Sequence, residues 1–187
     1  MQEIRIHGRG GQGVVTMGEL LAKSAIKIGK EAQTLPFFGV ERRGAAVKAA
    51  VRIDDTPIKV RSQSYKPDFL VLLNENLLDI ALADGIGDKG VIVANAPQPL
   101  KVNMTQWIVD ATAIAIKNNQ VRGGEPFVNV PMLGALCRLL EIPFSVLEKT
   151  LGEQWQGAKL TPNIATAREA YETIKEIQFQ GGLKQHG

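Results

Sequence analysis

The glycine-rich segment Gly8-Arg-Gly-Gly-Gln-Gly13 joins two stretches that differ in apolar periodicity. Before it, Ile4 and Ile6 alternate with charged or polar residues, which predicts a short strand. After it, apolar residues recur at steps of three and four from Val14 to Ile28, which predicts one face of a helix. A strand that turns directly into a helix through several glycines is typical of α/β domains, in which the turn approaches a ligand closely.

The rest of the chain continues this alternation of strands and helices. We predict further strands at 31–35, 47–53, 68–73, 91–94 and 107–109, and helices at 75–83, 111–118, 132–140, 145–155 and 163–177. Residues 58–60 are expected to return antiparallel to 47–53 as a hairpin. The pattern predicts a doubly wound, mostly parallel Rossmann-like α/β sheet with helices on both faces and an inserted β-hairpin. We expect one domain over residues 1–187, with a flexible tail from about 178 to 187.

The scarcity of cysteine limits the chemistry that this chain can carry. Its 187 residues include one cysteine, Cys137, which cannot form an internal disulfide, ligate an iron–sulfur cluster or complete a zinc site. No catalytic or metal-binding constellation is found, and His7 is interpreted as a structural residue. The sequence has no apolar run of the ~18 residues that a membrane-spanning helix needs, and no apolar signal segment at its start. We therefore expect a cytoplasmic protein without a membrane partner.

Basic residues are concentrated in the first third of the chain. Residues 1–67 carry 12 Lys and Arg against 6 Asp and Glu, whereas residues 68–187 carry 10 against 13. This asymmetry favours an anionic ligand or an acidic partner surface for the N-terminal part. Aromatic residues make up only 5% of the chain and no nucleic-acid motif is present, so we do not expect a nucleic-acid partner.

The glycine segment is the first candidate site, consisting of Gly8, Gly10, Gly11, Gln12 and Gly13. Free N–H groups at the start of the following helix would suit a phosphate or carboxylate. A dinucleotide cofactor would also need an acidic residue at the end of the second strand, but none lies near Leu35 and Glu31 is at the strand's start. A free-standing NAD(P)-dependent oxidoreductase and a nucleotide-sensing module remain alternatives, as does a purely structural role of the glycines in helix packing.

The second candidate site is the segment Phe37-Phe-Gly-Val-Glu-Arg-Arg-Gly44, which combines aromatic side chains with two adjacent arginines. This composition is typical of a protein interface, and either Arg42 or Arg43 could bind a phosphate or carboxylate. The alternative is a local ion pair between Glu41 and one of the arginines.

Together these motifs resemble the gamma subunit of 2-oxoacid:ferredoxin oxidoreductases. The resemblance rests on motifs that follow one another in the family's order up to about residue 175: Gly8–Val14, Phe38–Gly44, Val51–Ile53 with Pro57-Ile58, Pro67-Asp68, Asp110–Thr112 and Asn129–Gly134. The sequences GRGGQG and FFGVERRG are most similar to the pyruvate synthase type, with branched-chain 2-oxoacid enzymes as near neighbours. The 2-oxoglutarate type differs from this sequence at Arg9 and Arg42.

The resemblance implies a subunit of an enzyme that converts pyruvate, coenzyme A and oxidised ferredoxin to acetyl-CoA, carbon dioxide and reduced ferredoxin, or the reverse. It implies that thiamine diphosphate with Mg²⁺ and the [4Fe–4S] clusters belong to alpha, beta and ferredoxin-like delta partner subunits. The chain alone is then expected to be inactive, to support assembly and the coenzyme A region, and to self-associate when isolated. The interface or anion site would consist of Phe38, Glu41, Arg42, Arg43 and Asn129.

Overall fold

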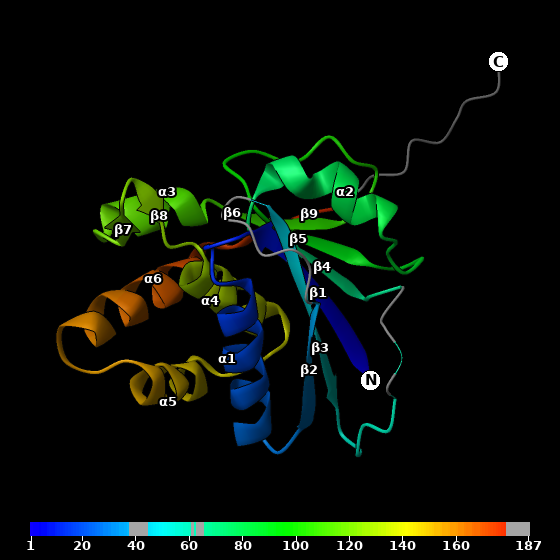
Figure 1. Cartoon of the computed structure of the whole chain (residues 1–187), viewed down its shortest axis with the longest axis horizontal. Coiled ribbons are helices and arrows are strands. Elements are labelled where there is room, and N and C mark those ends of the chain that lie inside the picture. Colours follow the sequence, from blue (N-terminus) through cyan, green and yellow to red (C-terminus); the bar gives the residue numbers. More distant parts are fainter. Residues whose placement is uncertain (38–44, 61, 63–65, 179–187) are drawn as a thin grey trace.

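The computed structural model describes residues 1–37, 45–60, 62 and 66–178. Its main strands are β1 (Gln2–Arg9), β2 (Glu31–Phe37), β3 (Ala46–Asp54), β4 (Phe69–Leu72), β5 (Val91–Asn95), β6 (Gln106–Val109) and β9 (Lys175–Ile177). Its α-helices are α1 (Val14–Lys27), α2 (Leu78–Ala83), α3 (Ala111–Lys117), α4 (Asn129–Leu139), α5 (Phe144–Gln154) and α6 (Leu160–Thr173). Short 3₁₀ helices span Glu75–Leu77 and Gly157–Lys159. Figure 1 shows the sheet at the centre of the molecule.

Seven strands form one sheet in the order β2-β3-β1-β4-β5-β6-β9. The central strands β1, β4, β5 and β6 are parallel to their neighbours in this set, whereas β3 runs antiparallel to β1 and β2, and β9 antiparallel to β6. After β1, the chain passes through α1 on one face of the sheet and adds β2 and β3 beside β1. After β4, it passes through α2 on the other face and adds β5 and β6 beyond β4. The predicted Rossmann-like α/β sheet with helices on both faces is therefore confirmed.

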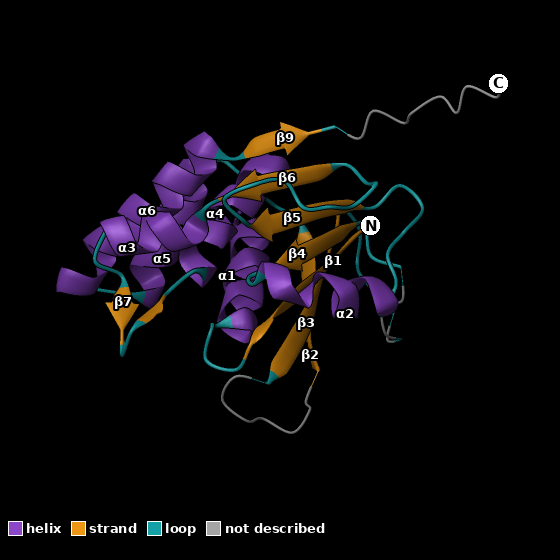
Figure 2. Ribbon diagram, turned by 90° about the horizontal axis from the view of Figure 1, so that it is seen from above, coloured by secondary structure: helices purple, strands orange, loops and turns teal. Residues whose placement is uncertain are grey.

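The two faces of the sheet are covered unequally. Side chains of α1, α3, α4, α5 and α6 pack on one face in the larger apolar cluster, while α2 packs on the other face in a smaller cluster. Figure 2 shows this asymmetry, with α2 alone opposite the main helical layer. In β4, Leu70 and Leu72 belong to the smaller cluster and Val71 to the larger one, and all three are fully buried. This explains why the strand has an unbroken apolar run.

Several predicted elements differ from the structure. Residues 58–60 are not a strand, because β3 is already paired on both sides, with β1 and with β2, which both come before it in the chain. The predicted helix 163–177 ends at Thr173, and the residues that follow Ile174 form β9 at the sheet edge. Sequence analysis also missed a small hairpin formed by β7 (Val121–Arg122) and β8 (Glu125–Pro126).

The helix predicted after the glycine segment is confirmed as α1. The helix that follows the glycine segment ends where Gly29 takes a φ of 82°. Cys137 is completely buried in the larger cluster, and burial raises the pKa of its thiol. No helix in the described part of the chain is long and apolar enough to cross a membrane.

The face of β1 opposite α1 carries a buried polar pair. Arg5 and His7 are each 2% exposed, and Arg5 Nε donates a hydrogen bond to His7 Nε2 at 3.1 Å. The Arg5 guanidinium also donates to carbonyl oxygens at the end of α2, those of Ala81, Asp84 and Gly85. Lys48 from β3 forms an ion pair with the Asp84 carboxylate at 2.7 Å. This polar pair therefore fixes α2 against the sheet, and the structural role expected for His7 is confirmed.

We predict that His7 makes the free energy of unfolding depend on pH. Burial, followed by the positive charges of Arg5 and Lys48, lowers the pKa of His7 from 6.5 to about 4. The unfolded chain binds this proton more readily, so the contribution is complete above pH 6.5 and is lost as the pH falls towards 4, by about 3 kcal/mol in all. Urea unfolding should show that the free energy of unfolding changes less between pH 7.5 and pH 5 in His7→Gln than in the natural protein. The amide oxygen of the glutamine can still accept a hydrogen bond from Arg5. Equal differences in both proteins would contradict this role.

A second prediction concerns the contact between α4 and α6. A Cβ at Gly134 would lie 2.1 Å from the backbone oxygen of Ala167 in α6. Gly134→Ala therefore has to separate the two helices, and we expect a loss of about 2 kcal/mol even after the gain in helix propensity. Gly152→Ala in α5 is the matched control, because a Cβ there meets nothing within 4 Å. Urea denaturation should show a lower midpoint for Gly134→Ala alone, and equal midpoints would disprove the close contact.

Candidate functional site

Two glycines at the turn from β1 into α1, Gly8 and Gly13, have no room for a side chain. A Cβ at Gly8 would lie 2.5 Å from Val14 Cγ2 and 3.2 Å from Leu73 Cδ1. Gly13, which precedes α1, has a φ of 76°, and a Cβ there would lie 2.5 Å from the side-chain nitrogen of Asn129. These glycines allow residues 8–13, the glycine loop, to turn tightly between β1 and α1.

Gln12 closes the glycine loop onto the end of β1. Its side-chain oxygen accepts a hydrogen bond from the backbone N–H of Arg9 at 2.7 Å, and its backbone N–H donates to the Arg9 carbonyl at 3.0 Å. The Gly10 N–H donates to the carbonyl oxygen of Ala45, just before β3, at 2.8 Å. These hydrogen bonds determine the conformation of the loop, and the Gln12 side chain contributes to them as an acceptor.

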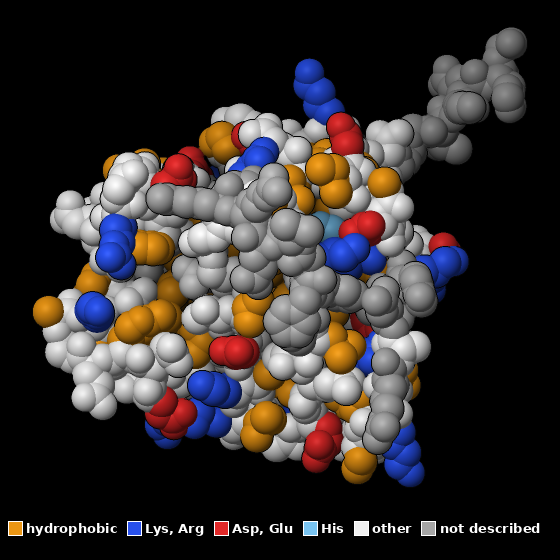
Figure 3. Space-filling model, viewed as in Figure 1, with side chains coloured by type: hydrophobic (Ala, Val, Ile, Leu, Met, Phe, Trp, Pro, Cys, Tyr) orange, Lys and Arg blue, Asp and Glu red, His pale blue; other side chains and the backbone are white. Residues whose placement is uncertain are grey.

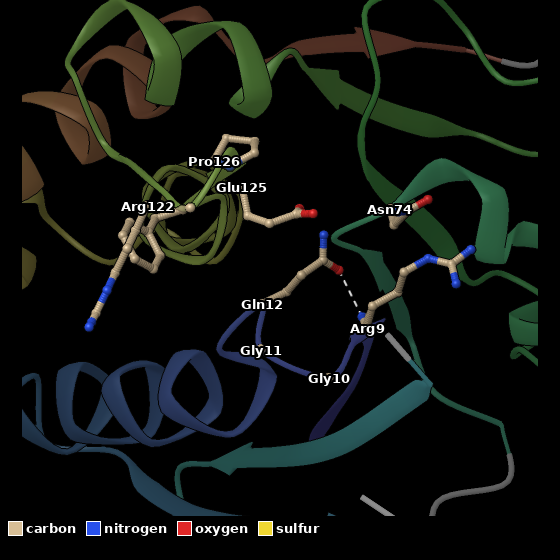
Figure 4. Close-up of a pocket in the computed structure, with 10 residues that line it drawn as sticks. Arg9, Gly10, Gly11, Gln12, Asn74, Arg122, Glu125 and Pro126 are labelled. Atoms are coloured by element: carbon tan, nitrogen blue, oxygen red, sulfur yellow. Dashed lines mark hydrogen bonds between the residues drawn. The ribbon is translucent and has the colours of Figure 1, made fainter. Parts of the chain in front are cut away.

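A cavity of about 590 Å³ lies between the glycine loop, the residue Asn74 that follows β4, and the β7–β8 hairpin. Figure 4 shows these three walls around the open space. The glycine loop contributes Arg9, Gly10, Gly11 and Gln12, and the hairpin region contributes Arg122, Gly123, Glu125, Pro126 and Phe127. β1 and β4 are neighbours whose following helices pack on opposite faces of the sheet, so their carboxyl ends form the crevice in which α/β proteins bind ligands.

The hairpin is the part of this site that sequence analysis missed. Gly123 and Gly124 have φ values of 60° and 82°, which is the pattern of a two-residue type I′ turn. The Phe127 N–H donates to the Gln120 carbonyl at 2.8 Å, which anchors the base of the hairpin. A Gly-Gly pair between Val121 and Phe127 was the available signal for this turn.

Asn129, which the sequence placed among the candidate interface residues, lies beside the glycine loop. It begins α4, is 8% exposed, and its side chain approaches the position where Gly13 lacks a Cβ. Two helices, α1 and α4, therefore begin next to each other at the end of β1, and their N-cap residues, Gly13 and Val128, supply no side-chain hydrogen bond. The other predicted interface residues, Phe38, Glu41, Arg42 and Arg43, lie outside the described residues.

Two further side chains organise the same edge of the sheet. Asp110, which follows β6, accepts a hydrogen bond from the Ala113 N–H at 2.8 Å and so caps α3. Asn95 at the end of β5 donates to the Leu73 carbonyl at 3.1 Å and accepts from the Thr112 N–H at 3.1 Å. Asp110 is therefore the N-cap of α3, and the contacts of Asn95 join the ends of β4 and β5 to the start of α3.

The sheet order is unfavourable for a dinucleotide. The strand beside β1 is the antiparallel β3, whereas β2 lies one position further out, at the edge. Glu31 is at the start of β2, paired in register with Asp54 at the end of β3, and so lies at the opposite end of the sheet from the glycine loop. The described residues therefore place no carboxylate at the end of a strand parallel and adjacent to β1 on the β3 side, where the ribose of a dinucleotide would bind.

The described residues do not fit the metal-containing groups of the family that the sequence resembles. Cys137 is a lone buried thiol, and a [4Fe–4S] cluster needs several thiolates. Within the described ranges, no three His, Cys, Asp or Glu side chains lie close enough together to hold a metal ion. On the face drawn in Figure 3, basic and acidic side chains are interspersed rather than gathered in a basic stripe.

Comparison with known proteins gives a consistent family. Residues 3–173 match the family described as pyruvate ferredoxin/flavodoxin oxidoreductase. The pyruvate synthase subunit PorC of Methanothermobacter thermautotrophicus is 43% identical, over 95% of this chain and 98% of that protein. The pyruvate/ketoisovalerate oxidoreductases common subunit gamma of Pyrococcus furiosus is 38% identical, over 96% of this chain and 100% of that protein.

A solved structure gives the same result. The pyruvate oxidoreductase subunit PORC of Thermotoga maritima has a TM-score of 0.80 and 32% identity, over 95% of this chain and 98% of that one. The similarity in sequence and in fold therefore spans nearly the full length of these subunits. The chain belongs to the pyruvate ferredoxin/flavodoxin oxidoreductase family, in which it is similar to the gamma, or PorC, subunits.

Proposed function

We propose that this chain is the gamma subunit of a pyruvate-type 2-oxoacid:ferredoxin oxidoreductase, and that its glycine-loop cavity binds part of coenzyme A. The observation that carries the proposal is the position of the cavity. It lies at the carboxyl ends of β1 and β4 and is lined by the same glycine motif on which the family resemblance rests. Its volume of about 590 Å³ is in the range of small-molecule sites.

The chain then acts together with other subunits in the cytoplasm. Thiamine diphosphate with Mg²⁺ and the [4Fe–4S] clusters are assigned to alpha, beta and ferredoxin-like delta subunits, and electrons pass from there to ferredoxin. The lone cysteine of this chain supports that division of labour. The gamma subunit contributes to assembly and to the coenzyme A side of the active site, and it transfers no electrons itself.

Substrate choice belongs to the same proposal. The name of the Methanothermobacter relative refers to pyruvate synthase, and that of the Pyrococcus relative to a subunit common to pyruvate and ketoisovalerate enzymes. A gamma chain that serves two enzymes cannot by itself distinguish their 2-oxoacids. We therefore assign pyruvate on the GRGGQG and FFGVERRG motifs, keep a branched-chain 2-oxoacid as the alternative, and place the 2-oxoacid pocket on the partner chains.

We predict that a methyl group added at Gly11 weakens coenzyme A binding in the assembled enzyme. Gly11 lines the cavity with a φ of 96°, and Gly29, away from the cavity, has a φ of 82°. A Cβ at either position meets nothing within 4 Å, so both alanine variants carry a similar left-handed backbone strain. Gly11→Ala should raise the KM for coenzyme A about fivefold or more, whereas Gly29→Ala should not. Equal KM values in two intact complexes would refute a coenzyme A site in this cavity.

We also predict that Arg42 and Arg43 bind anionic groups of coenzyme A. Removing one arginine–phosphate contact should raise the KM for coenzyme A about tenfold, because such contacts are charge-assisted. Steady-state kinetics of Arg42→Ala and Arg43→Ala complexes would test this, with Arg168→Ala in α6 as a control on a side chain that pairs with Glu148 instead. An unchanged KM together with intact assembly would remove both the ligand and the interface role of these arginines.

A further inference from the structure

Two of the polar side chains that line the glycine-loop cavity, Gln12 and Glu125, place a hydrogen-bond donor and an acceptor on opposite walls. The Gln12 side-chain oxygen is held by the Arg9 N–H at 2.7 Å, so the orientation of the amide is determined and its nitrogen is left on the other side. Figure 4 shows this nitrogen pointing into the cavity, towards the hairpin. No described residue accepts a hydrogen bond from it, so two N–H groups are available to a ligand.

The opposite wall presents a carboxylate. Figure 4 shows Glu125 of β8 directed into the cavity towards Gln12, whereas the Arg122 side chain points away from it. Glu125 pairs in register with Arg122 across the type I′ turn, so the hairpin backbone sets its position. Among the described residues its carboxylate has neither an ion pair nor a hydrogen bond, and it is available as an acceptor.

This arrangement disfavours a phosphate at this point of the cavity. A phosphate bound to Gln12 would lie near the Glu125 carboxylate, and like charges at such separations repel each other. A neutral group that both accepts and donates hydrogen bonds satisfies both walls. A secondary amide does so, because its carbonyl accepts from the Gln12 nitrogen and its N–H donates to the Glu125 carboxylate.

We infer that Gln12 and Glu125 bind a secondary amide of the ligand, and so determine that its uncharged arm lies in this cavity. The inference rests on the proposed function: the pantetheine arm of coenzyme A contains two secondary amides, whereas its nucleotide end carries the phosphates. The arm passes between the glycine loop and the hairpin, and the phosphates lie outside this pair. Asn74 lines the third wall of the cavity, where its side-chain oxygen accepts from the Asn76 N–H at 3.0 Å.

The test uses the assembled enzyme and two halves of coenzyme A as competitive inhibitors: pantetheine, and adenosine 3′,5′-bisphosphate. Gln12→Glu keeps an acceptor for the Arg9 N–H but replaces the donor in the cavity with a second carboxylate. It should raise the inhibition constant of pantetheine about tenfold and leave that of the nucleotide half within about twofold. Gln156→Glu, in an exposed segment that does not line the cavity, adds the same charge as a control.

Two more variants keep the inference testable if Gln12→Glu assembles poorly. Glu125 is exposed on the hairpin, so Glu125→Ala should leave assembly intact. It should raise the inhibition constant of pantetheine about fivefold. The double variant Gln12→Glu/Glu125→Gln removes the repulsion and restores a donor, so it should bind pantetheine within about threefold of the natural protein.

The outcomes separate the inference from the proposed function. Suppose that Gly11→Ala raises the KM for coenzyme A while the Gln12 and Glu125 variants change the inhibition constants of both halves equally, or of the nucleotide half alone. In that case the amide inference is wrong and the coenzyme A site is still supported. If none of these variants changes either half or the KM, the coenzyme A site itself is wrong.

Discussion

The site depends on the lack of space around the last residues of β1. Gly8 is packed so closely against Val14 and Leu73 that a Cβ there would lie within 2.5 Å of one and 3.2 Å of the other. With Gly13 in the left-handed region, the chain turns from β1 into α1 within a few residues and keeps its amides at the sheet edge. A bulkier residue at either position would move Gln12 or Asn129, and the cavity would lose the wall that carries its donor.

The remainder of the fold holds the neighbouring walls against this turn. Asn95 links the end of β4 to the start of α3, and α3 leads directly into the hairpin that carries Glu125. On the opposite face, Arg5 donates hydrogen bonds to carbonyl oxygens at the end of α2. These bonds hold α2 against the sheet, and with it the segment from the end of β4 through Asn74. The cavity is therefore built by three segments that lie far apart in the sequence.

The sequence was informative where a local pattern has a direct physical cause. The apolar run that ends at Leu73 predicted a central strand, and the glycine loop predicted the turn from β1 into α1, because burial on both faces and a tight turn each restrict residue type. The predicted pairing of residues 58–60 with 47–53 was wrong, because β1 and β2 occupy both sides of β3 and nothing in residues 58–60 signals this. The strand at Lys175–Ile177 was predicted as helix because three residues at a sheet edge carry too little periodicity. Glu125 was missed because its role comes only from a hairpin folded towards a loop more than 100 residues earlier.

Hydrogen–deuterium exchange on the assembled enzyme, with and without coenzyme A, tests the central claim most directly. We predict that coenzyme A slows exchange in the backbone amides of residues 9–16 and 120–128, the two segments that face each other across the cavity. Residues at the opposite end of the sheet, around Trp107 and Arg138, should be unaffected. Protection confined to that opposite end, or none in this chain while coenzyme A is bound, would contradict a coenzyme A site in the cavity.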